Sequence, residues 1–186
     1  MTKSKSTVIV VGGPAGTGKT TQGEALSSYF KCPFIEGDAL HPQANIDKMS
    51  SGIPLTDDDR WGWLEEISQT SSSSAANPDN ESHIAIVSCS MLKKKYRDYI
   101  KEHSSNPDVV FRFVFIYTTF EELMNRVSNR KGHFMKNDMV KSQYDIMEIP
   151  QGDELLNNGG DCIAIDATGK SPEVISKEII DYQDLA

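Results

Sequence analysis

The sequence predicts an α/β protein in which a parallel sheet is covered by helices on both faces. Short apolar runs rich in β-branched residues alternate with longer segments of helical character, and strands joined by helical crossovers give this pattern. A glycine-rich stretch separates the first apolar run from the first helical segment. The 186 residues are enough for one domain with a good core and too few for two ordinary ones. We therefore expect a single domain over residues 1–186.

Five apolar runs are expected to form the strands. The first, STVIVVG at residues 6–12, is a continuous β-branched run of the kind found in buried parallel strands. The remaining predicted strands span residues 33–38, 83–90, 109–117 and 161–166. Helices are predicted at residues 19–30, 42–50, 91–103, 120–130 and 138–148, around residues 61–67, and from residue 172 onward.

Local signals mark several boundaries of these elements. Pro42 suits the first turn of a helix and Gly52 suits its end. Thr56, followed three residues later by Asp59, resembles a capping box. Residues 70–82, TSSSSAANPDNES, are of low complexity, so we expect a flexible surface loop there.

Charge and composition argue against several classes of protein. A net charge of −8 is the opposite of the basic surface that nucleic-acid-binding proteins carry, so no nucleic-acid partner is expected. The apolar run near the start is too short for a signal peptide or a membrane span, which predicts a cytoplasmic protein with no membrane partner. The 3 cysteines form no C-x-x-C pair, so reduced and mostly buried thiols are expected.

The stretch GPAGTGKT at residues 13–20 fits the phosphate-loop pattern G-x-x-x-x-G-K-[ST] in full, and it lies between a predicted strand and a predicted helix, as the mechanism requires. Glycines let backbone N–H groups surround the β-phosphate, and the helix N-terminus favours negative charge. Lys19 is expected to reach the β- and γ-phosphate oxygens, and the Thr20 hydroxyl to bind Mg²⁺. The residues predicted to bind ATP here are Gly13, Pro14, Ala15, Gly16, Thr17, Gly18, Lys19, Thr20 and Thr21.

A phosphate loop is shared by GTPases, motor ATPases and small-molecule kinases, so other features must separate these classes. The chain has no N-K-x-D motif for guanine. Its third predicted strand ends on Ser88 and Cys89, without the aspartate that most ATPases have there. These features favour the short kinases in which acidic groups at the second strand help to hold magnesium, a role that Glu36 can fill.

Three further motifs resemble those of the gluconokinase family. They are GDALHPQANIDKMSSGIPLTDDDRWGWL, SCSMLKKKYRDYI and RKGHFM, and the similarity runs from about residue 8 to residue 154. The resemblance implies transfer of a phosphoryl group from ATP, with Mg²⁺, to O6 of D-gluconate, which would feed 6-phospho-D-gluconate into the pentose phosphate pathway. It also implies the P-loop fold of nucleoside monophosphate kinases: sheet order 2-3-1-4-5, substrate-binding helices at about 38–68, a small lid at about 126–150, and an assembly compatible with a homodimer.

Asp38 follows the second predicted strand, at the sheet edge where ligands bind in parallel sheets. A carboxylate there can accept the proton of a hydroxyl that attacks a γ-phosphate, so Asp38 is the expected base. Alternatively it caps the helix that begins near His41, and the two roles can coexist. Asn45 and Lys48 share a helical face with His41 and either extend the sugar site or face solvent.

The resemblance implies substrate-binding roles for four more residues outside the lid. In shikimate kinases an arginine at the place of Arg60 binds the substrate carboxylate, to which a guanidinium makes two parallel hydrogen bonds. His41 and Ser88 are expected to contact substrate hydroxyls. Lys93 is expected to neutralise negative charge on the substrate.

The stretch RVSNRKGH at residues 126–133 also resembles the arginine pattern of adenylate kinase lids. This implies that Arg126 stacks on the adenine and that Arg130 contacts the phosphates during transfer. His133, in the same lid, is expected to contact the substrate. Closure of such a lid excludes water and limits hydrolysis of ATP.

Two other functions remain open at this point. One is a kinase for another small hydroxy acid, such as shikimate. The other, of a different class, is a nucleotide-binding regulator without catalytic activity. A silent protein would be expected to lose Lys19, Asp38 or the lid arginines, and this chain retains all of them.

Overall fold

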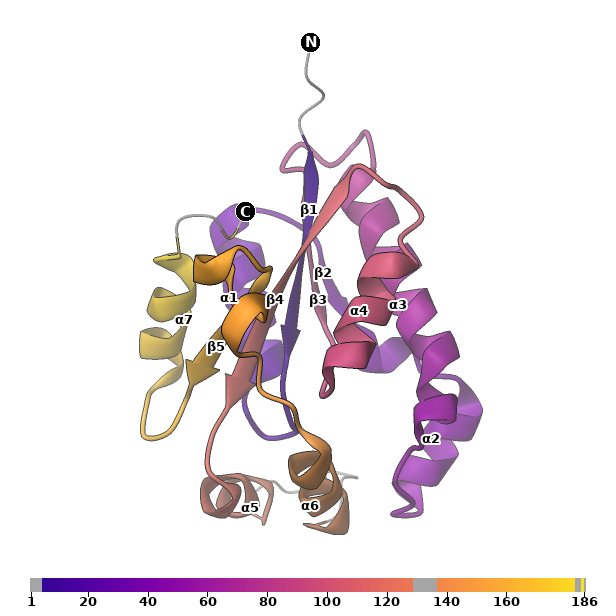
Figure 1. Ribbon diagram of the computed structural model, residues 1–186, viewed down its shortest axis with the longest axis vertical. Helices are drawn as coiled ribbons and strands as arrows, with labels where there is room; N and C mark the ends of the chain where they lie inside the picture. Colours follow the sequence, from indigo (N-terminus) through magenta and orange to yellow (C-terminus); the bar gives the residue numbers. More distant parts are fainter. Residues whose placement is uncertain (1–4, 129–136, 183–184, 186) are drawn as a thin grey trace.

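The computed structural model describes residues 5–128, 137–182 and 185. Its centre is a five-stranded sheet of order β2-β3-β1-β4-β5, in which every strand pairs with its neighbours in parallel (Figure 1). The strands are β1 Ser6–Gly12, β2 Phe34–Glu36, β3 Ile84–Ser88, β4 Val109–Tyr117 and β5 Cys162–Asp166. The predicted fold class and strand order are confirmed.

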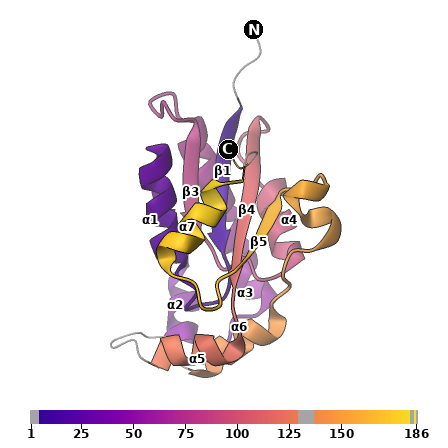
Figure 2. The ribbon, with the colours of Figure 1, turned by 90° about the vertical axis from the view of Figure 1, so that its left-hand side faces the viewer.

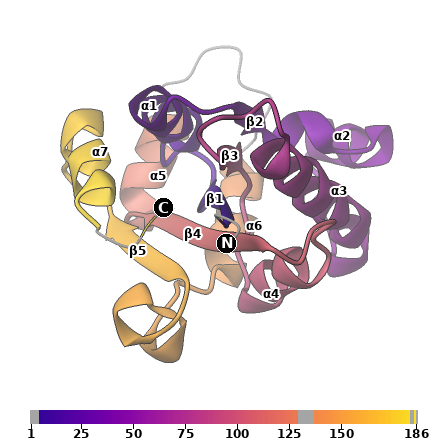
Figure 3. The same cartoon turned by 90° about the horizontal axis from the view of Figure 1, so that it is seen from above.

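Helices cover both faces of this sheet. They are α1 Lys19–Phe30, α2 Gln43–Ser50, α3 Asp57–Ala76, α4 Lys94–Glu102, α5 Phe120–Ser128, α6 Asn137–Ile146 and α7 Pro172–Ile180. Figure 2 looks onto α1 and α7, which cover one face, and Figure 3 shows α3 and α4 on the other. The crossovers between parallel strands are helical, as a parallel sheet requires.

The two faces of the sheet bury two apolar layers. Val8 and Val10 of β1 pack with the α3 and α4 side, whereas Ile9 and Val11 pack with the α1 and α7 side. All four side chains are fully buried. Successive side chains of a strand point to opposite faces, so a β-branched run with no polar interruption is what a doubly covered strand needs.

Helices α5 and α6 pack against each other beyond the carboxyl ends of the strands (Figure 1). Their contact is a small apolar cluster of Leu123, Val127 and Val140. This pair stands where a lid over the sheet edge is expected. Residues 129–136, which join the two helices, lie outside the described residues.

The loop predicted for the serine-rich segment 70–82 is wrong for residues 70–76, which are helical. Helix α3 continues through them to Ala76. Ser68, Ser71 and Ser72 are fully buried. The Ser71 hydroxyl donates to the carbonyl of Ile67 at 2.6 Å, and that of Ser72 to the carbonyl of Ser68 at 2.6 Å. Because a serine in a helix can bond to the carbonyl one turn back, it enters a core without an unsatisfied hydroxyl.

The remainder of that segment is a turn held by one side chain. The Asn80 amide donates to the carbonyl of Ser74 at 3.0 Å and to that of Ile84 at 2.9 Å. It thereby ties the end of α3 to the start of β3. Low complexity in the sequence therefore coexists here with specific contacts.

Two expectations from composition can be compared with the structure. The three cysteines are unpaired; Cys89 and Cys162 are buried and Cys32 is half-buried, as predicted. Among the described residues, no helix is both long and apolar enough to cross a membrane.

Candidate active site

The phosphate loop leaves β1 at Gly13 and enters α1 at Lys19. Gly13 has a φ of 129°, and a side chain there would bring its Cβ within 2.0 Å of the carbonyl oxygen of Ile116. Gly18, at a φ of 85°, is the N-cap of α1 and supplies no side-chain cap. The first N–H groups of α1 therefore remain available to an anion, and the loop fits a phosphate.

A hydroxyl and a carboxylate meet beside this loop. Thr20 Oγ1 lies 3.0 and 3.1 Å from the two carboxylate oxygens of Glu36, at the end of β2. Ser88 holds that carboxylate in place, because its hydroxyl donates to Glu36 at 2.9 Å and accepts from the N–H of Gly37 at 3.1 Å. In the described part of the chain no group of three or more His, Cys, Asp or Glu side chains could hold a metal alone. A cation here would take further oxygens from phosphate and water.

Asp38 lies in the short 3₁₀ helix Gly37–Leu40 that follows β2. Its side chain is 62% exposed and lines the same pocket as Lys19. The N-cap of α2 is Pro42, so Asp38 does not cap that helix. The carboxylate is thus left to face the pocket, where a substrate can reach it.

His41 forms a fixed wall of this pocket. Its ring stacks on Trp63 with centroids 3.9 Å apart and an angle of 14°, and its Nε2 lies 4.0 Å from Asp38 Oδ1. Burial lowers the pKa of His41 to about 4, and the cations of Arg60 and Lys19 act in the same direction, while Asp38 opposes them. The imidazole is therefore neutral at pH 7.

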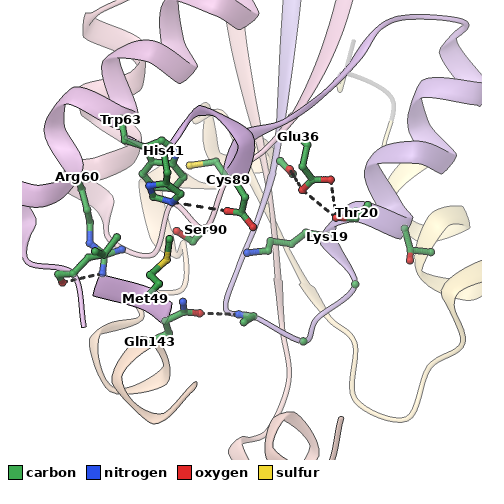
Figure 4. A pocket seen from close by; sticks show the side chains of 17 residues that line it. Lys19, Thr20, Glu36, His41, Met49, Arg60, Trp63, Cys89, Ser90 and Gln143 are labelled. Atoms are coloured by element: carbon green, nitrogen blue, oxygen red, sulfur yellow. Dashed lines mark hydrogen bonds and ion pairs between the residues drawn. The ribbon is translucent and has the colours of Figure 1, made fainter. Parts of the chain in front are cut away.

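Arg60 brings a buried cation to the opposite side of the pocket from the phosphate loop (Figure 4). The residue is 4% exposed. Its Nη2 donates to the carbonyl of Leu55 at 3.2 Å, and its Cζ lies 5.3 Å from the ring centroid of Tyr96. Its Nε is buried without a hydrogen-bond partner. A buried donor left open in this way is suited to an anionic ligand.

Two side chains from the α5 and α6 pair reach the phosphate loop. Arg126 Nη1 donates to the carbonyl of Gly16 at 3.2 Å, and Nη2 pairs with Glu122 at 2.7 Å. Gln143 Oε1 accepts from the N–H of Ala15 at 2.8 Å. The helices of the expected lid are therefore in contact with the loop that would hold the phosphates.

Most of the residues predicted for the site share one pocket. Thr17 and Pro14 brace the loop instead, because the Thr17 hydroxyl donates to the Pro14 carbonyl at 2.8 Å. Arg130 and His133 lie outside the described residues. The predicted residues that line the pocket are Ala15, Gly16, Gly18, Lys19, Thr20, Thr21, Glu36, Asp38, His41, Arg60 and Ser88.

The placement of Lys93 does not support a substrate-binding role. Its ammonium lies 3.2 Å from the carboxylate of Asp57, which Lys95 and the Tyr96 hydroxyl also contact. Lys93 is not among the described residues that line the pocket. Its charge is already neutralised by an internal partner that the sequence motif does not reveal.

Several residues that line or support the pocket were not among the predicted site residues; Met49, Leu55, Cys89 and Ser90 line it as well. Trp63 stacks on His41, Gln143 reaches the loop, and Asn45 lies behind the histidine. Asn45 is 3% exposed, so the solvent-facing alternative for it is wrong. Lys48 pairs with Asp59 at 2.8 Å and extends no sugar site. The spacing of His41 and Asn45 by one helical turn was the only signal for their contact.

Comparisons with known proteins agree with this arrangement. Residues 15–183 match the family model described as shikimate kinase. A probable gluconokinase of Saccharomyces cerevisiae is 44% identical over 184 residues, with 96% of this chain and 91% of that protein covered. The thermosensitive gluconokinase of Escherichia coli is 42% identical over 142 residues, with 76% and 72% covered.

Solved structures give the same picture. The gluconokinase from Sinorhizobium meliloti superimposes with a TM-score of 0.75 at 38% identity, covering 95% of this chain and 90% of that chain. A sugar kinase from Janibacter reaches a TM-score of 0.81 at 31% identity, covering 98% and 96%. With most of its length also matching the shikimate kinase family model, the chain belongs to the gluconokinase family.

Proposed function

We propose that this protein transfers the γ-phosphoryl group of ATP to O6 of D-gluconate, with Mg²⁺, giving 6-phospho-D-gluconate and ADP. One observation carries the proposal. A phosphate loop, an exposed carboxylate and a buried, incompletely bonded arginine line a single pocket. They are the groups needed for a phosphoryl donor, a hydroxyl acceptor and the carboxylate of a sugar acid.

Asp38 is the proposed base. The O6 hydroxyl attacks the γ-phosphorus, the new O–P bond forms as the bond to the β-phosphate oxygen breaks, and the hydroxyl proton passes to the Asp38 carboxylate. Lys19 neutralises charge that develops on the β/γ oxygens. No covalent intermediate with the protein is needed, since positioning and charge neutralisation suffice for in-line transfer.

The residues beside the loop fit Mg²⁺. A hydroxyl and a carboxylate, Thr20 and Glu36, lie 3.0 Å apart at their nearest oxygens, and Ser88 orients the carboxylate. Mg²⁺ prefers oxygen ligands and usually takes one or two protein groups together with phosphates and water. When bound, the ion would neutralise phosphate charge. Glu36 would contact it directly or through water.

Arg60 is the residue proposed to bind the carboxylate of the sugar acid. Its guanidinium is held between the Leu55 carbonyl and the Tyr96 ring, and its free Nε can donate to a carboxylate. Another hydroxy acid, such as shikimate, would satisfy the same arginine, so this remains the second candidate. The relatives named gluconokinase favour the sugar acid.

The cellular setting is also part of the proposal. We place the protein in the cytoplasm, where its three unpaired thiols would stay reduced. Its product would then enter the pentose phosphate pathway. ATP and the sugar acid are its proposed small-molecule partners, and a homodimer stays a prediction.

The test is release of ADP, measured across a panel of D-gluconate, shikimate and other small hydroxy acids. D-gluconate should give the highest kcat/KM, and phosphate should appear on O6 by ³¹P NMR. Lys19→Ala is the control and should lower kcat by roughly 10²-fold to 10³-fold, as expected for loss of a group that neutralises developing charge. A panel in which shikimate is preferred would replace the substrate, and no turnover with any acid would overturn the proposal.

A further inference from the structure

We propose that Asn45 is a positioning residue that fixes the tautomer of His41, so that Nε2–H and the Asp38 carboxylate together hold one substrate hydroxyl. The inference deepens the proposed function and rests on it. It concerns a side chain that does not line the pocket itself but lies directly behind one that does.

The orientation of the Asn45 amide follows from its surroundings. The side chain is buried, and one of its terminal atoms lies 2.8 Å from the backbone carbonyl oxygen of Asp59. A carbonyl only accepts hydrogen bonds, so that atom must be the nitrogen, Nδ2. The same nitrogen lies 3.2 Å from Nδ1 of His41, and its second hydrogen is free for that contact.

The orientation of Asn45 then decides the tautomer of His41. An amide N–H directed at Nδ1 requires an unprotonated Nδ1 that accepts. In a neutral imidazole the proton then resides on Nε2. The ring is neutral because burial lowers its pKa to about 4. Nε2–H is therefore a donor that faces Asp38.

The ring cannot easily turn to escape this arrangement. It stacks on Trp63 at 3.9 Å, and the Trp63 indole N–H donates to the Gly37 carbonyl at 2.9 Å. That carbonyl belongs to the residue just before Asp38. The carboxylate and the imidazole are thus held by one connected set of contacts. Figure 4 shows the stacked rings of His41 and Trp63.

The distance between the two groups suits a hydroxyl placed between them. Nε2 and Asp38 Oδ1 are 4.0 Å apart, too far for a direct hydrogen bond. An oxygen about 2.8 Å from each could accept from Nε2–H and donate to the carboxylate. The hydroxyl proton would then point at the proposed base, and the second lone pair of the oxygen would be free to attack the phosphate. An ether or carbonyl oxygen, which has no proton to donate, would not satisfy this pair.

The first experiment reads the tautomer in the native, full-length protein without substrate. Long-range ¹H–¹⁵N spectra of ¹⁵N-histidine-labelled protein at pH 7 distinguish protonated from unprotonated ring nitrogens. The His41→Gln variant assigns the His41 signals by their loss. We expect a neutral ring with Nε2 protonated and Nδ1 bare. A protonated Nδ1 in the native protein would overturn the inference, whatever the protein phosphorylates.

The second experiment replaces the hydrogen-bond donor that faces Nδ1 of His41 with an acceptor. Asn45→Asp keeps the shape of the side chain but offers an acceptor, so Nδ1 should become protonated. The ring then either loses its Nε2–H or becomes a cation that weakens Asp38 as a base. Either change should lower kcat for gluconate by roughly 10-fold to 100-fold with little change in the KM for ATP.

Asn158→Asp, the same substitution at an exposed position of the 3₁₀ helix Leu156–Asn158, is the matched control and should leave kcat and the His41 signals unchanged. An Asn45→Asp protein with an unchanged Nδ1, or with a changed Nδ1 and normal kcat, would overturn the role of Asn45. If Asn45→Asp fails to fold, the native spectrum alone still decides the tautomer. Absence of gluconate turnover in the native protein would instead refute the proposed function.

Discussion

The two ends of α3 are both rich in polar residues, yet they differ in what they do. At the amino end, Asp57–Arg60 begins the helix and delivers Arg60 and Trp63 to the pocket. Toward the carboxyl end, Ser68, Ser71 and Ser72 face the scaffold and are fully buried. The ends of this 20-residue helix lie about 30 Å apart along its axis. One helix thus links the substrate wall to the core beneath α4.

The two ends of α3 are both polar but differ in whether their buried polar groups have hydrogen-bond partners. Ser71 and Ser72 place their hydroxyls on carbonyls of the helix itself, so these groups need nothing further. Arg60 keeps a buried Nε that no described group satisfies. Buried polar groups whose hydrogen bonds are all made within the protein support the fold. A buried donor that lacks a partner, such as Arg60 Nε, is available to a ligand.

The largest expected effect is at the site end. Gluconate and D-glucitol share a hydroxyl chain, but only gluconate has a carboxylate at C1. Leaving one member of a buried ion pair unpaired typically costs about 2–5 kcal/mol, roughly 30-fold to several thousand-fold in kcat/KM. D-glucitol should therefore be a poor substrate. Arg60→Ala should lose most activity on gluconate and much less on D-glucitol.

Arg60→Lys sharpens this test because lysine keeps the charge without the two-pronged geometry, so its kcat/KM for gluconate should be intermediate. Steady-state kinetics of the three proteins on both substrates gives the comparison. An Arg60→Ala protein weakened equally on both substrates would mean that the arginine supports the fold or the nucleotide. A native enzyme that uses both substrates equally well would refute the carboxylate assignment.

At the far end a charge should damage stability rather than catalysis. Ser72→Asp would bury a carboxylate beside the carbonyl oxygen of Ser68, which cannot donate to it, and should lower the free energy of unfolding by about 3 kcal/mol. Its neighbour Ser73 is exposed, and Ser73→Asp should change that free energy by at most about 0.5 kcal/mol. Urea unfolding measures both, and kcat of the folded Ser72→Asp protein should stay near normal. Equal effects at the two positions would contradict the burial of Ser72.

This far end also shows what the sequence could not predict. The strands, the capping box of Thr56 and Asp59, and the phosphate loop follow from local patterns, and the structure confirms them. The serine-rich composition of α3 predicts a loop, because a solvated linker and a buried helix can have the same composition. Only the neighbouring α4 and β3, which pack on these serines, decide between the two.

The residues of the site also divide into those that the sequence predicts and those that only the fold reveals. Lys19, Asp38 and Arg60 could be predicted to share a pocket, because a motif or a resemblance marks each of them. Gln143 could not, and for Asn45 the sequence left the site and the solvent equally open. Both roles depend on distances set by folding: 2.8 Å from Gln143 to the Ala15 N–H and 3.2 Å from Asn45 to His41. The pairing of Lys93 with Asp57 could not be predicted for a related reason, since Asp57 lies in the first turn of α3, distant in sequence.

The smallest expected effect is a dependence of stability on pH that belongs to the site end alone. His41, stacked on Trp63, has a pKa of about 4 when folded and an ordinary value of 6.5 when unfolded, chiefly because it is buried. Its contribution to stability is complete above pH 6.5 and is lost as the pH falls toward 4, because the unfolded chain takes up a proton that the folded one refuses. At pH 5 the loss should be about 1–2 kcal/mol.

The acidic groups at the same end act in a separate window. Hydrogen bonds from Lys95 and Tyr96 lower the pKa of Asp57, and those from Lys48 and Thr56 lower that of Asp59 to about 2. Because these carboxylates have depressed pKa values, their contribution to stability persists down to about pH 4 and is lost only below it.

Urea unfolding between pH 7 and pH 5 therefore measures the contribution of His41 apart from that of these carboxylates. The native protein should lose stability across this range, and His41→Gln, which cannot titrate, should show a shallower slope. Identical slopes for the two proteins would mean that His41 accepts a proton in the folded state as readily as in water. The neutral imidazole that the proposed hydroxyl site requires would then not be maintained by burial.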